Sequence, residues 1–394
     1  MFETLAAAPP DPILSLIGLF RDDPRPGKID LGIGVYRDAA GHTPILRTVR
    51  EAERRLYESE TTKTYVGPAG DPAFCAAVAG LVFGEAHPGD RLRAVQTPGG
   101  AGALRVLAGL IARSRPGVTV WVPDPTWVNH ISILADAGLP VRPHPYFDPA
   151  TGGVRVDAML DALRGAAPGD VVLLHGCCHN PTGASLTAAD WDAVCDVITS
   201  RNLFPFVDLA YQGFGDGLEE DAYAVRLFAR RLPEMVVAVS CSKNFGIYRE
   251  RTGAAFVLAT DAARAAVAHS QLVVVARITY SMPPDHGGAI VRIILADPSL
   301  TADWKAELAA MRGYVVGHRE ALAEAFRRRT NTDRFDFLTT HRGMFSLLGT
   351  TPEQAARLRA EHAVYIVADG RINLAGLRDD QIEPFVAAVA AVCG

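Results

Sequence analysis

The sequence has little of what marks a secreted, membrane or nucleic-acid-binding protein. Only six of its 394 residues are cysteine, and Cys177 and Cys178 are adjacent, so no disulfide framework is indicated. No stretch reaches the ~18 uninterrupted apolar residues that a membrane span needs. The start, MFETLAAAPPDPI, contains an acidic residue and prolines but no apolar run of the secretory kind. We therefore expect a reduced, cytoplasmic protein that is not bound to a membrane.

Charge of one sign is also not concentrated anywhere. The chain has 39 basic and 44 acidic residues, a net charge of −5. A nucleic-acid-binding protein normally carries a basic stripe, and none is visible here. With 49% hydrophobic and 21% charged residues, the composition is that of an ordinary folded protein with a sizeable core. The expected partners are small molecules rather than nucleic acid.

The middle of the chain alternates short apolar runs with longer amphipathic segments. Helices are predicted at 101–114 and 187–202, and the strands are predicted at 91–97, 118–124, 171–177, 203–209, 234–242 and 253–259. This alternation is typical of an α/β fold, with a mostly parallel central sheet of about seven strands covered by helices on both faces. In such sheets a ligand binds at the carboxyl ends of the strands.

Beyond about residue 300 the pattern changes to that of a smaller α+β unit. A long helix is predicted at 304–329. Short strands follow at 334–340, 344–349, 364–368 and 371–376, and an apolar helix closes the chain. We expect the beginning of the chain to join this unit. The predicted division is a large domain over 45–300 and a small domain made of 1–44 plus 301–394.

Two segments that follow predicted strands offer a glycine turn and an indole. In PGGAGALR, the glycines around Gly100 allow close approach of a ligand to the backbone, and the following helix start suits a phosphate. A tight turn without any ligand explains this motif equally well. In PTWVNH, Trp127 either packs in the core or stacks on a planar ring.

The next two strands end in an amide and a carboxylate. In LLHGCCHNPTG, turn chemistry alone is one explanation of Asn180. Adjacent cysteines on a strand point to opposite faces and no spaced second pair follows, so no metal is expected at Cys177 and Cys178. Asp208 ends a wholly apolar strand, where it is either solvated or met by a cationic group.

Lys243 comes directly after the predicted apolar strand 234–242. It lies close to Ser240, Ser242 and Arg251. A lysine is usually a surface residue, but the apolar strand before it argues for a partly desolvated amine of lowered pKa, which is nucleophilic. An amine, a carboxylate, an amide, an indole and a phosphate-binding turn together suit one ligand, pyridoxal 5′-phosphate (PLP).

These residues also lie in motifs of a known family. The chain resembles the class I aminotransferases of PLP fold type I, specifically the aspartate and aromatic amino-acid aminotransferases. The motifs run in family order along the chain and include TKTYVG, PGGAGALR, PTWVNH, LLHGCCHNPTG, DLAYQGFGDG, SCSKNFGIYRERTG, YSMPPDHGG and RINLAG. SCSKNFGIYRERTG and SMPPDHGG are closest to the bacterial aromatic aminotransferases.

The resemblance implies the roles of the cofactor residues. Lys243 is expected to form the Schiff base with PLP and to move the proton at the substrate Cα. Asp208 is expected to pair with the pyridinium nitrogen, supported by His130, while Trp127 stacks on the ring. Tyr211 and Asn180 are expected at the ring hydroxyl. The residues expected around the phosphate are Gly100, Ala101, Ser240, Ser242 and Arg251, with Tyr65 from a neighbouring subunit.

The resemblance also implies a shared substrate pocket in a homodimer. Arg371 is expected to hold the substrate α-carboxylate with the help of Gly34 and Asn180, beside Trp127. Arg277 is expected to reach across the dimer to a side-chain carboxylate. Ala101 stands where a threonine is common, so one phosphate contact should be missing. Met282 and Val35 are expected to line the side-chain end of the pocket, where Met282 replaces a common asparagine and favours an apolar substrate.

The expected activity is therefore transamination from tyrosine, phenylalanine or tryptophan to 2-oxoglutarate by a ping-pong mechanism. Aspartate transamination as the main activity is the alternative. A PLP enzyme that breaks a different bond, such as a decarboxylase or a carbon–sulfur synthase, is a second alternative. A non-enzymatic regulator on the same fold is a third.

Overall fold

The computed structural model describes residues 1–7 and 12–393 and has a seven-stranded sheet at its centre. The strands lie in the order β2 (Leu92–Pro98), β8 (Thr252–Leu258), β7 (Met235–Ser240), β6 (Phe204–Leu209), β5 (Val171–His175), β3 (Val120–Asp124) and β4 (Val141–Pro145). β8 is antiparallel to both of its neighbours, and the other pairs are parallel. The prediction of a mostly parallel sheet of about seven strands is confirmed.

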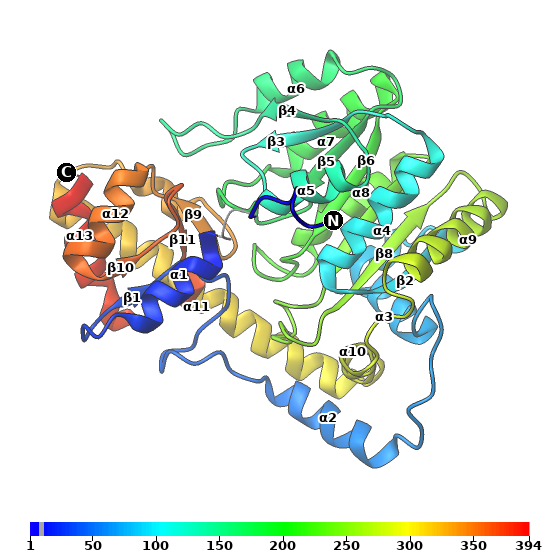
Figure 1. Ribbon diagram of the computed structural model, residues 1–394, viewed down its shortest axis with the longest axis horizontal. Coiled ribbons are helices and arrows are strands. Elements are labelled where there is room, and N and C mark those ends of the chain that lie inside the picture. Colours follow the sequence, from blue (N-terminus) through cyan, green and yellow to red (C-terminus); the bar gives the residue numbers. More distant parts are fainter. Residues whose placement is uncertain (8–11, 394) are drawn as a thin grey trace.

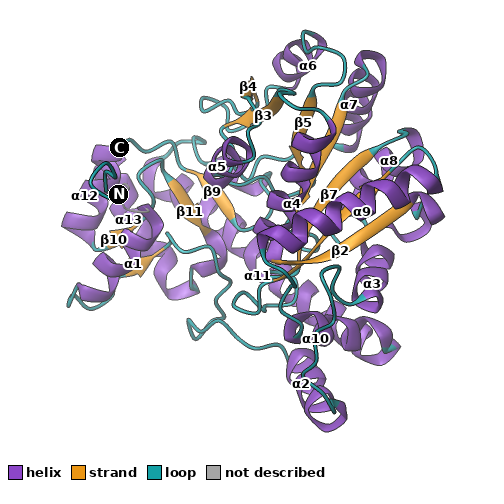
Figure 2. Ribbon diagram, turned by 45° about the vertical axis from the view of Figure 1, so that its right-hand side comes forward, coloured by secondary structure: helices purple, strands orange, loops and turns teal. Residues whose placement is uncertain are grey.

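Helices cover both faces of this sheet (Figures 1 and 2). One face is covered by α4 (Gly99–Ser114), α5 (Val128–Asp136) and α9 (Ala262–Thr279). The other face is covered by α3 (Pro72–Phe83), α6 (Val156–Arg164), α7 (Ala188–Arg201) and α8 (Tyr223–Arg231). α2 (Arg47–Ser59) and α10 (His286–Ala296) pack against each other below the sheet in Figure 1.

The apolar strands supply both layers of the core. In β7, Val237 and Val239 belong to the core beneath α3 and α8, whereas Val236 and Ala238 belong to the core beneath α4. Successive side chains of a strand point to opposite faces, so a strand covered on both sides needs apolar residues at every position. This explains the continuous apolar runs in the sequence.

A smaller group of elements forms the left part of Figure 1. It contains α1 (Pro12–Asp22), α12 (Pro352–His362), α13 (Ile382–Cys393) and two small sheets. One sheet pairs β1 (Ile29–Asp30) with β10 (Val364–Tyr365), and the other pairs β9 (Phe345–Leu347) with β11 (Arg371–Asn373). The pairing of β1 with β10 brings the beginning of the chain to its end, as the predicted division requires. The exact bounds of the two domains stay a prediction.

The long helix α11 (Pro298–Thr330) links the two parts of the molecule. Near its start, Trp304 is fully buried, and its indole N–H donates to the carbonyl of Asn244 at 2.8 Å. The same indole stacks on Phe245, with ring centroids 4.4 Å apart. The segment that follows Lys243 is therefore held by this helix.

Most predicted elements are confirmed, but three expectations are wrong. Residues 334–340 form a 3-10 turn at Asp336–Thr339 instead of a strand, because Phe335 and Leu338 are buried on one side at helical spacing. The strand β4 was missed because it contains two prolines, which an edge strand tolerates. The third error concerns Cys177 and Cys178, which lie in a bend after the end of β5 and not on a strand.

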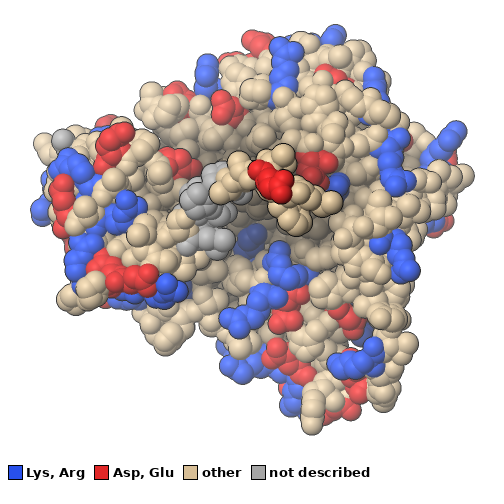
Figure 3. Space-filling model, in the orientation of Figure 1, with Lys and Arg blue, Asp and Glu red and all other residues tan. Residues whose placement is uncertain are grey.

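On the face shown in Figure 3, acidic and basic side chains are intermixed and no basic stripe is present. Within the described part of the chain, no helix combines the length and the apolar character that crossing a membrane requires.

Candidate active site

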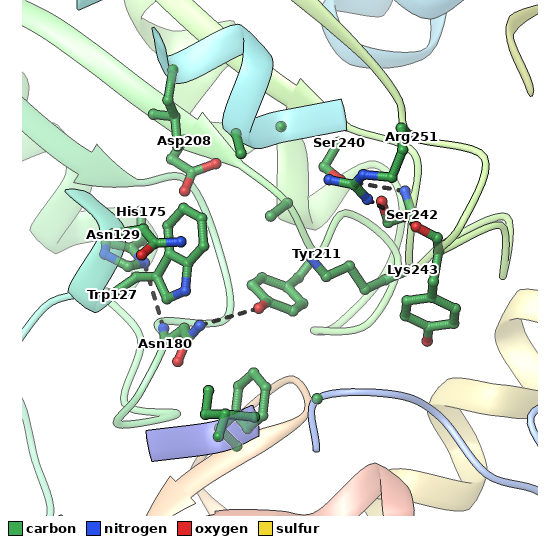
Figure 4. Close-up of a pocket in the computed structure, with 18 of the residues that line it drawn as sticks. Trp127, Asn129, His175, Asn180, Asp208, Tyr211, Ser240, Ser242, Lys243 and Arg251 are labelled. Atoms are coloured by element: carbon green, nitrogen blue, oxygen red, sulfur yellow. Dashed lines mark hydrogen bonds between the residues drawn. The ribbon is translucent and has the colours of Figure 1, made fainter. Parts of the chain in front are cut away.

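A cavity of about 360 Å³ lies at the carboxyl ends of the parallel strands. It brings together twelve of the predicted site residues, namely Gly34, Gly100, Ala101, Trp127, Asn180, Asp208, Tyr211, Ser240, Ser242, Lys243, Arg251 and Arg371. Figure 4 shows Asp208 at one end of this pocket and the group of Ser240, Ser242 and Arg251 at the other, with Tyr211 between them. Residues that are far apart in the sequence therefore face one volume.

Asp208, the penultimate residue of β6, carries a buried carboxylate. Its Oδ2 atom accepts a hydrogen bond from His130 Nε2 at 3.0 Å. Its Oδ1 atom is buried and has no hydrogen-bond partner in the described structure. Burial alone would raise the pKa of Asp208, but the bond from His130 and the nearby cationic groups hold this pKa below its usual value. A buried, ionised oxygen without a donor is costly unless a ligand supplies one.

A chain of hydrogen bonds behind Asp208 determines the tautomer of His130. The backbone N–H of Asn180 donates to His175 Nδ1 at 3.4 Å, so the proton of His175 lies on Nε2, 3.1 Å from Thr126 Oγ1. The Thr126 hydroxyl then donates to His130 Nδ1 at 2.8 Å, which leaves the His130 proton on Nε2, facing Asp208. Burial lowers the pKa of His175 to about 3, so this ring is neutral. His130 itself does not line the cavity.

Lys243 lies three residues after the end of β7, with its ammonium nitrogen 4.7 Å from the centre of the Tyr211 ring. Burial lowers the pKa of Lys243 to about 8, although the carboxylate of Asp208 acts in the opposite direction. At pH 7, about a tenth of such an amine is unprotonated. Lys243 is therefore a far better nucleophile than an ordinary lysine.

The glycine turn before α4 forms an anion-binding end of the pocket. α4 begins at Gly99, and its N-cap residue, Pro98, provides no side-chain cap, so the first N–H groups of the helix have no capping side chain. A Cβ atom on Gly99 would lie 2.7 Å from an Arg251 nitrogen, and one on Gly100 would lie 2.9 Å from the Ser240 Cβ. Glycine is thus required for the close approach of the guanidinium and hydroxyl groups to this turn.

The opposite wall contains a second guanidinium group. Arg371 donates to the carbonyl of Gly32 at 3.0 Å and to Asn180 Oδ1 at 3.4 Å. It lies 4.6 Å from the centre of the Phe345 ring and forms no ion pair among the described residues. Asn180 also donates to the Tyr211 hydroxyl at 3.3 Å. A buried guanidinium without a carboxylate is suited to binding one.

Besides His130, four of the predicted residues lie outside this cavity in the single chain. Tyr65 is 88% exposed, and Arg277 points to Ser281, whose hydroxyl it contacts at 3.1 Å. Met282 accepts a hydrogen bond from the backbone of Val66 at 3.2 Å through its sulfur. Val35 does not line the cavity, although its neighbour Gly34 does. The roles predicted for Tyr65, Arg277 and Met282 would require a second copy of the chain, and they stay predictions.

The structure adds residues that sequence reasoning did not assign to the site. The cavity is also lined by Ile13, Leu104, Asn129, His175, Ala210, Tyr248 and Phe345. His175 belongs to the motif LLHGCCHNPTG and Phe345 to the predicted strand 344–349, so the signal was present without a role. Phe345 is placed by Arg319 of α11, whose buried guanidinium donates to the carbonyls of Gly343 and Phe345 at 2.7 and 2.8 Å.

Together the fold and the pocket define a class of protein. It is an α/β enzyme that offers a reactive lysine, a buried carboxylate and two guanidinium groups to an anionic ligand at the ends of its parallel strands. Comparison with known proteins agrees with this class.

The family model "Aminotransferase class I and II" matches residues 26–389. The chain is 50% identical over 392 residues to an aromatic-amino-acid aminotransferase of Paracoccus denitrificans and 45% identical over 395 residues to an aspartate aminotransferase of Escherichia coli (strain K12), with 100% of each chain covered in both cases. A solved aromatic-amino-acid aminotransferase from Burkholderia pseudomallei, covalently bound to pyridoxal phosphate, has a TM-score of 0.97 at 42% identity, also with full coverage of both chains. This chain belongs to the class I and II aminotransferase family, and the predicted fold type is confirmed.

The Asp208→Asn substitution tests the electrostatics of the pocket. Burial and Arg251 lower the pKa of Lys243, and Asp208 is the group that raises it. Removal of this negative charge should move the pKa of Lys243 below 8, and each pH unit of displacement corresponds to about 1.4 kcal/mol. The measurement is the pH profile of Lys243 acylation in the cofactor-free chain, read by mass spectrometry. Trp127→Phe, which changes no charge, is the control, and an unchanged or higher midpoint in Asp208→Asn would contradict the assignment.

Proposed function

We propose that this chain is a PLP-dependent transaminase that moves the amino group of an aromatic L-amino acid (tyrosine, phenylalanine or tryptophan), and of aspartate, to 2-oxoglutarate by a ping-pong mechanism. The observation that carries the proposal is the meeting of Lys243 and Asp208 in one pocket with the unpaired guanidinium of Arg371. Membership of the aminotransferase family supports it.

The pocket residues fit PLP. The Asp208 Oδ1 atom lacks a donor, and a protonated pyridine nitrogen is a donor of the right charge. The uncapped start of α4, with Ser240, Ser242 and Arg251, suits the phosphate group. When bound, the cofactor supplies an electron-withdrawing ring that accepts charge developing at the substrate Cα. The side chains expected beside this ring are Trp127, Asn180 and Tyr211.

The residues of the chain would then bind the substrate and move its proton. Arg371 binds the α-carboxylate through two parallel N–H···O bonds, which orients the Cα–H bond relative to Lys243. The amine of Lys243, with a pKa of about 8, accepts and returns this proton near neutral pH. Gly34 and Arg371 belong to the proposed small domain and Lys243 to the large one, so the closure of the two domains would exclude water.

The lining of the pocket supports an apolar side-chain subsite. Besides His175, the basic residues that line it are Lys243, Arg251 and Arg371, and each of these has a role above. A second substrate carboxylate therefore requires another cation, and Arg277 of a second copy is the candidate. An aromatic ring instead requires apolar contacts, which Phe345 provides and which Met282 and Val35 are proposed to extend. Aspartate transamination as the main activity is the alternative, favoured by the similarity to the aspartate aminotransferase.

The exposed surface supports the homodimer that this arrangement needs. On α9, Val267, Val274 and Ile278 are 57%, 41% and 69% exposed, and their spacing places them on one side of the helix. Arg277 lies on the same helix, beside Ile278. Exposed apolar side chains in a stripe mark an interaction surface.

We also propose a cytoplasmic location, in keeping with six unpaired cysteines.

The Lys243→Ala substitution tests the function directly. Transamination from phenylalanine to 2-oxoglutarate, followed as glutamate formation, should be abolished because no other amine lines the pocket. PLP should still bind through its ring and phosphate contacts, but borohydride should no longer fix it to the chain. Recovery of pyridoxyl label on another lysine after reduction of the unmodified enzyme would disprove the assignment of Lys243.

The Arg277→Ala substitution tests the basis of specificity. The kcat/KM for aspartate should fall by a factor that corresponds to a few kcal/mol of transition-state stabilisation, as for the loss of a charge-assisted pair. The kcat/KM for phenylalanine should be little affected. Met282→Asn should cost about 1 kcal/mol for phenylalanine, the scale of one lost apolar contact. Asparagine can still accept the hydrogen bond from Val66, so the loop should keep its conformation. Equal losses for both substrates in Arg277→Ala would rule out Arg277 as the discriminating residue.

A mixing experiment tests the shared site. On its own, neither the Lys243→Ala chain nor the Arg277→Ala chain should transaminate aspartate at an appreciable rate. In a mixed dimer of the two, one of the two sites should have both residues. We expect aspartate activity to reappear on mixing, to at most about a quarter of the native value at a statistical distribution of chains. Sedimentation of the active enzyme as a monomer would exclude the arrangement.

A further inference from the structure

A second cavity, of about 440 Å³, lies on the other side of the segment that carries His175 and Asn180. Its lining includes the thiols of Cys177 and Cys178 and the carboxylate of Asp221. His175 lines both cavities, so this one adjoins the back of the cofactor pocket. None of the three groups has a role in the function proposed above.

The backbone conformation brings the two thiols to the same side. β5 ends at His175, and Cys178 has a φ of 51°, in the left-handed region that residues other than glycine seldom adopt. The space for its side chain is provided by Gly343, where a Cβ atom would lie 2.4 Å from the Cβ of Cys178. The ligand atoms of Cys177, Cys178 and Asp221 all lie within 4.8 Å of one another.

Asp221 is held rigidly by the backbone. Its Oδ2 atom accepts hydrogen bonds from the N–H groups of Gly213 and Gly215 at 2.7 and 2.8 Å, and its Oδ1 atom accepts one from Asp216 at 3.0 Å. An ionised carboxylate offers about four acceptor sites, so roughly one remains free. The carboxylate is thus pre-oriented and able to bind one further partner as a monodentate ligand.

The charges around this cavity favour a cation. Asp216 and Glu220 lie in its exposed part and Asp221 lies inside. Burial lowers the pKa of the lining histidines, His175 and His179, so Arg342 is the charged basic residue among the described lining. Arg342 is already paired with Asp216 at 2.6 Å. A cavity that is lined mainly by one sign of charge concentrates ions of the opposite sign.

We propose that Cys177, Cys178 and Asp221 form a binding site for a thiophilic divalent cation of the zinc type. Two thiolates and one carboxylate suit such an ion, and three protein ligands leave a fourth position open, for which the cavity has room. Contact with Cys178 and burial raise the pKa of Cys177, and burial raises that of Cys178, so both thiols are protonated at neutral pH. Binding therefore replaces two S–H bonds by two metal–sulfur bonds and releases two protons, with no change in oxidation state.

The experiment uses Cd²⁺ as the probe on the holoenzyme, reduced with a phosphine and freed of metal under anaerobic conditions. The ultraviolet sulfur-to-cadmium charge-transfer band should grow and saturate at one Cd²⁺ per chain, and a pH-stat should record two protons released per ion. Cys177→Ser and Cys178→Ser should lose the stoichiometric band. Asp221→Asn should weaken binding by about tenfold or more, the scale seen when even a residue that only supports a metal ligand is removed.

The matched control is Cys393→Ser, which removes a partly exposed thiol far along the chain and should leave the titration unchanged. The cofactor absorbance of each variant shows whether it is folded, and Cys177→Ala is the second variant if Cys178→Ser fails to fold. A band that survives in folded Cys177→Ser or Cys177→Ala, or one that does not saturate at one equivalent, would overturn the proposal. Loss of the band in Cys393→Ser would do so too.

Discussion

The structure of the site depends on one constraint, which is the ionised carboxylate of Asp208 at the end of an apolar strand. One of its oxygens is satisfied by His130, and the other is buried with no donor in the described structure. Such a group is costly unless it is compensated. The protein supplies the Nε2–H of His130 to one oxygen, and we propose that a cationic ligand atom compensates the other.

The hydrogen-bond chain through Thr126 and His175 explains how the Nε2–H of His130 is kept facing the carboxylate of Asp208. Each donor in the chain has one acceptor, and the chain ends in the backbone N–H of Asn180, which cannot act as an acceptor. The direction of every bond follows from that end. The same residue, Asn180, contacts Tyr211 and Arg371 with its side chain. Tyr211 and Arg371 are therefore both positioned by one residue.

The sequence predicted those parts of the molecule that depend on local pattern. Continuous apolar runs located β5, β6, β7 and β8, and residues that follow β5, β6 and β7 proved to face one cavity. The strand predicted at 334–340 was wrong because Phe335 and Phe337 alternate as in a strand, whereas burial follows the three-residue spacing of Phe335 and Leu338. His175 was missed as a site residue because its role depends on partners 5 and 49 positions away. Phe345 depends on Arg319 in a distant helix. The roles expected of Tyr65 and Arg277 rest on the family resemblance and require a second chain, so they stay predictions.

The two cavities show why a short segment can serve two sites. His175 is the last residue of β5, where its side chain faces one way, and the bend that follows turns the side chains of Cys177 and Cys178 the other way before Asn180 returns to the first cavity. This reversal within six residues requires a left-handed residue, which is Cys178 with its φ of 51°. A substitution that relaxed this bend would displace the thiols and Asn180 together. Because Asn180 bonds both Tyr211 and Arg371, the turn that directs the two thiols into the second cavity also positions two residues of the first.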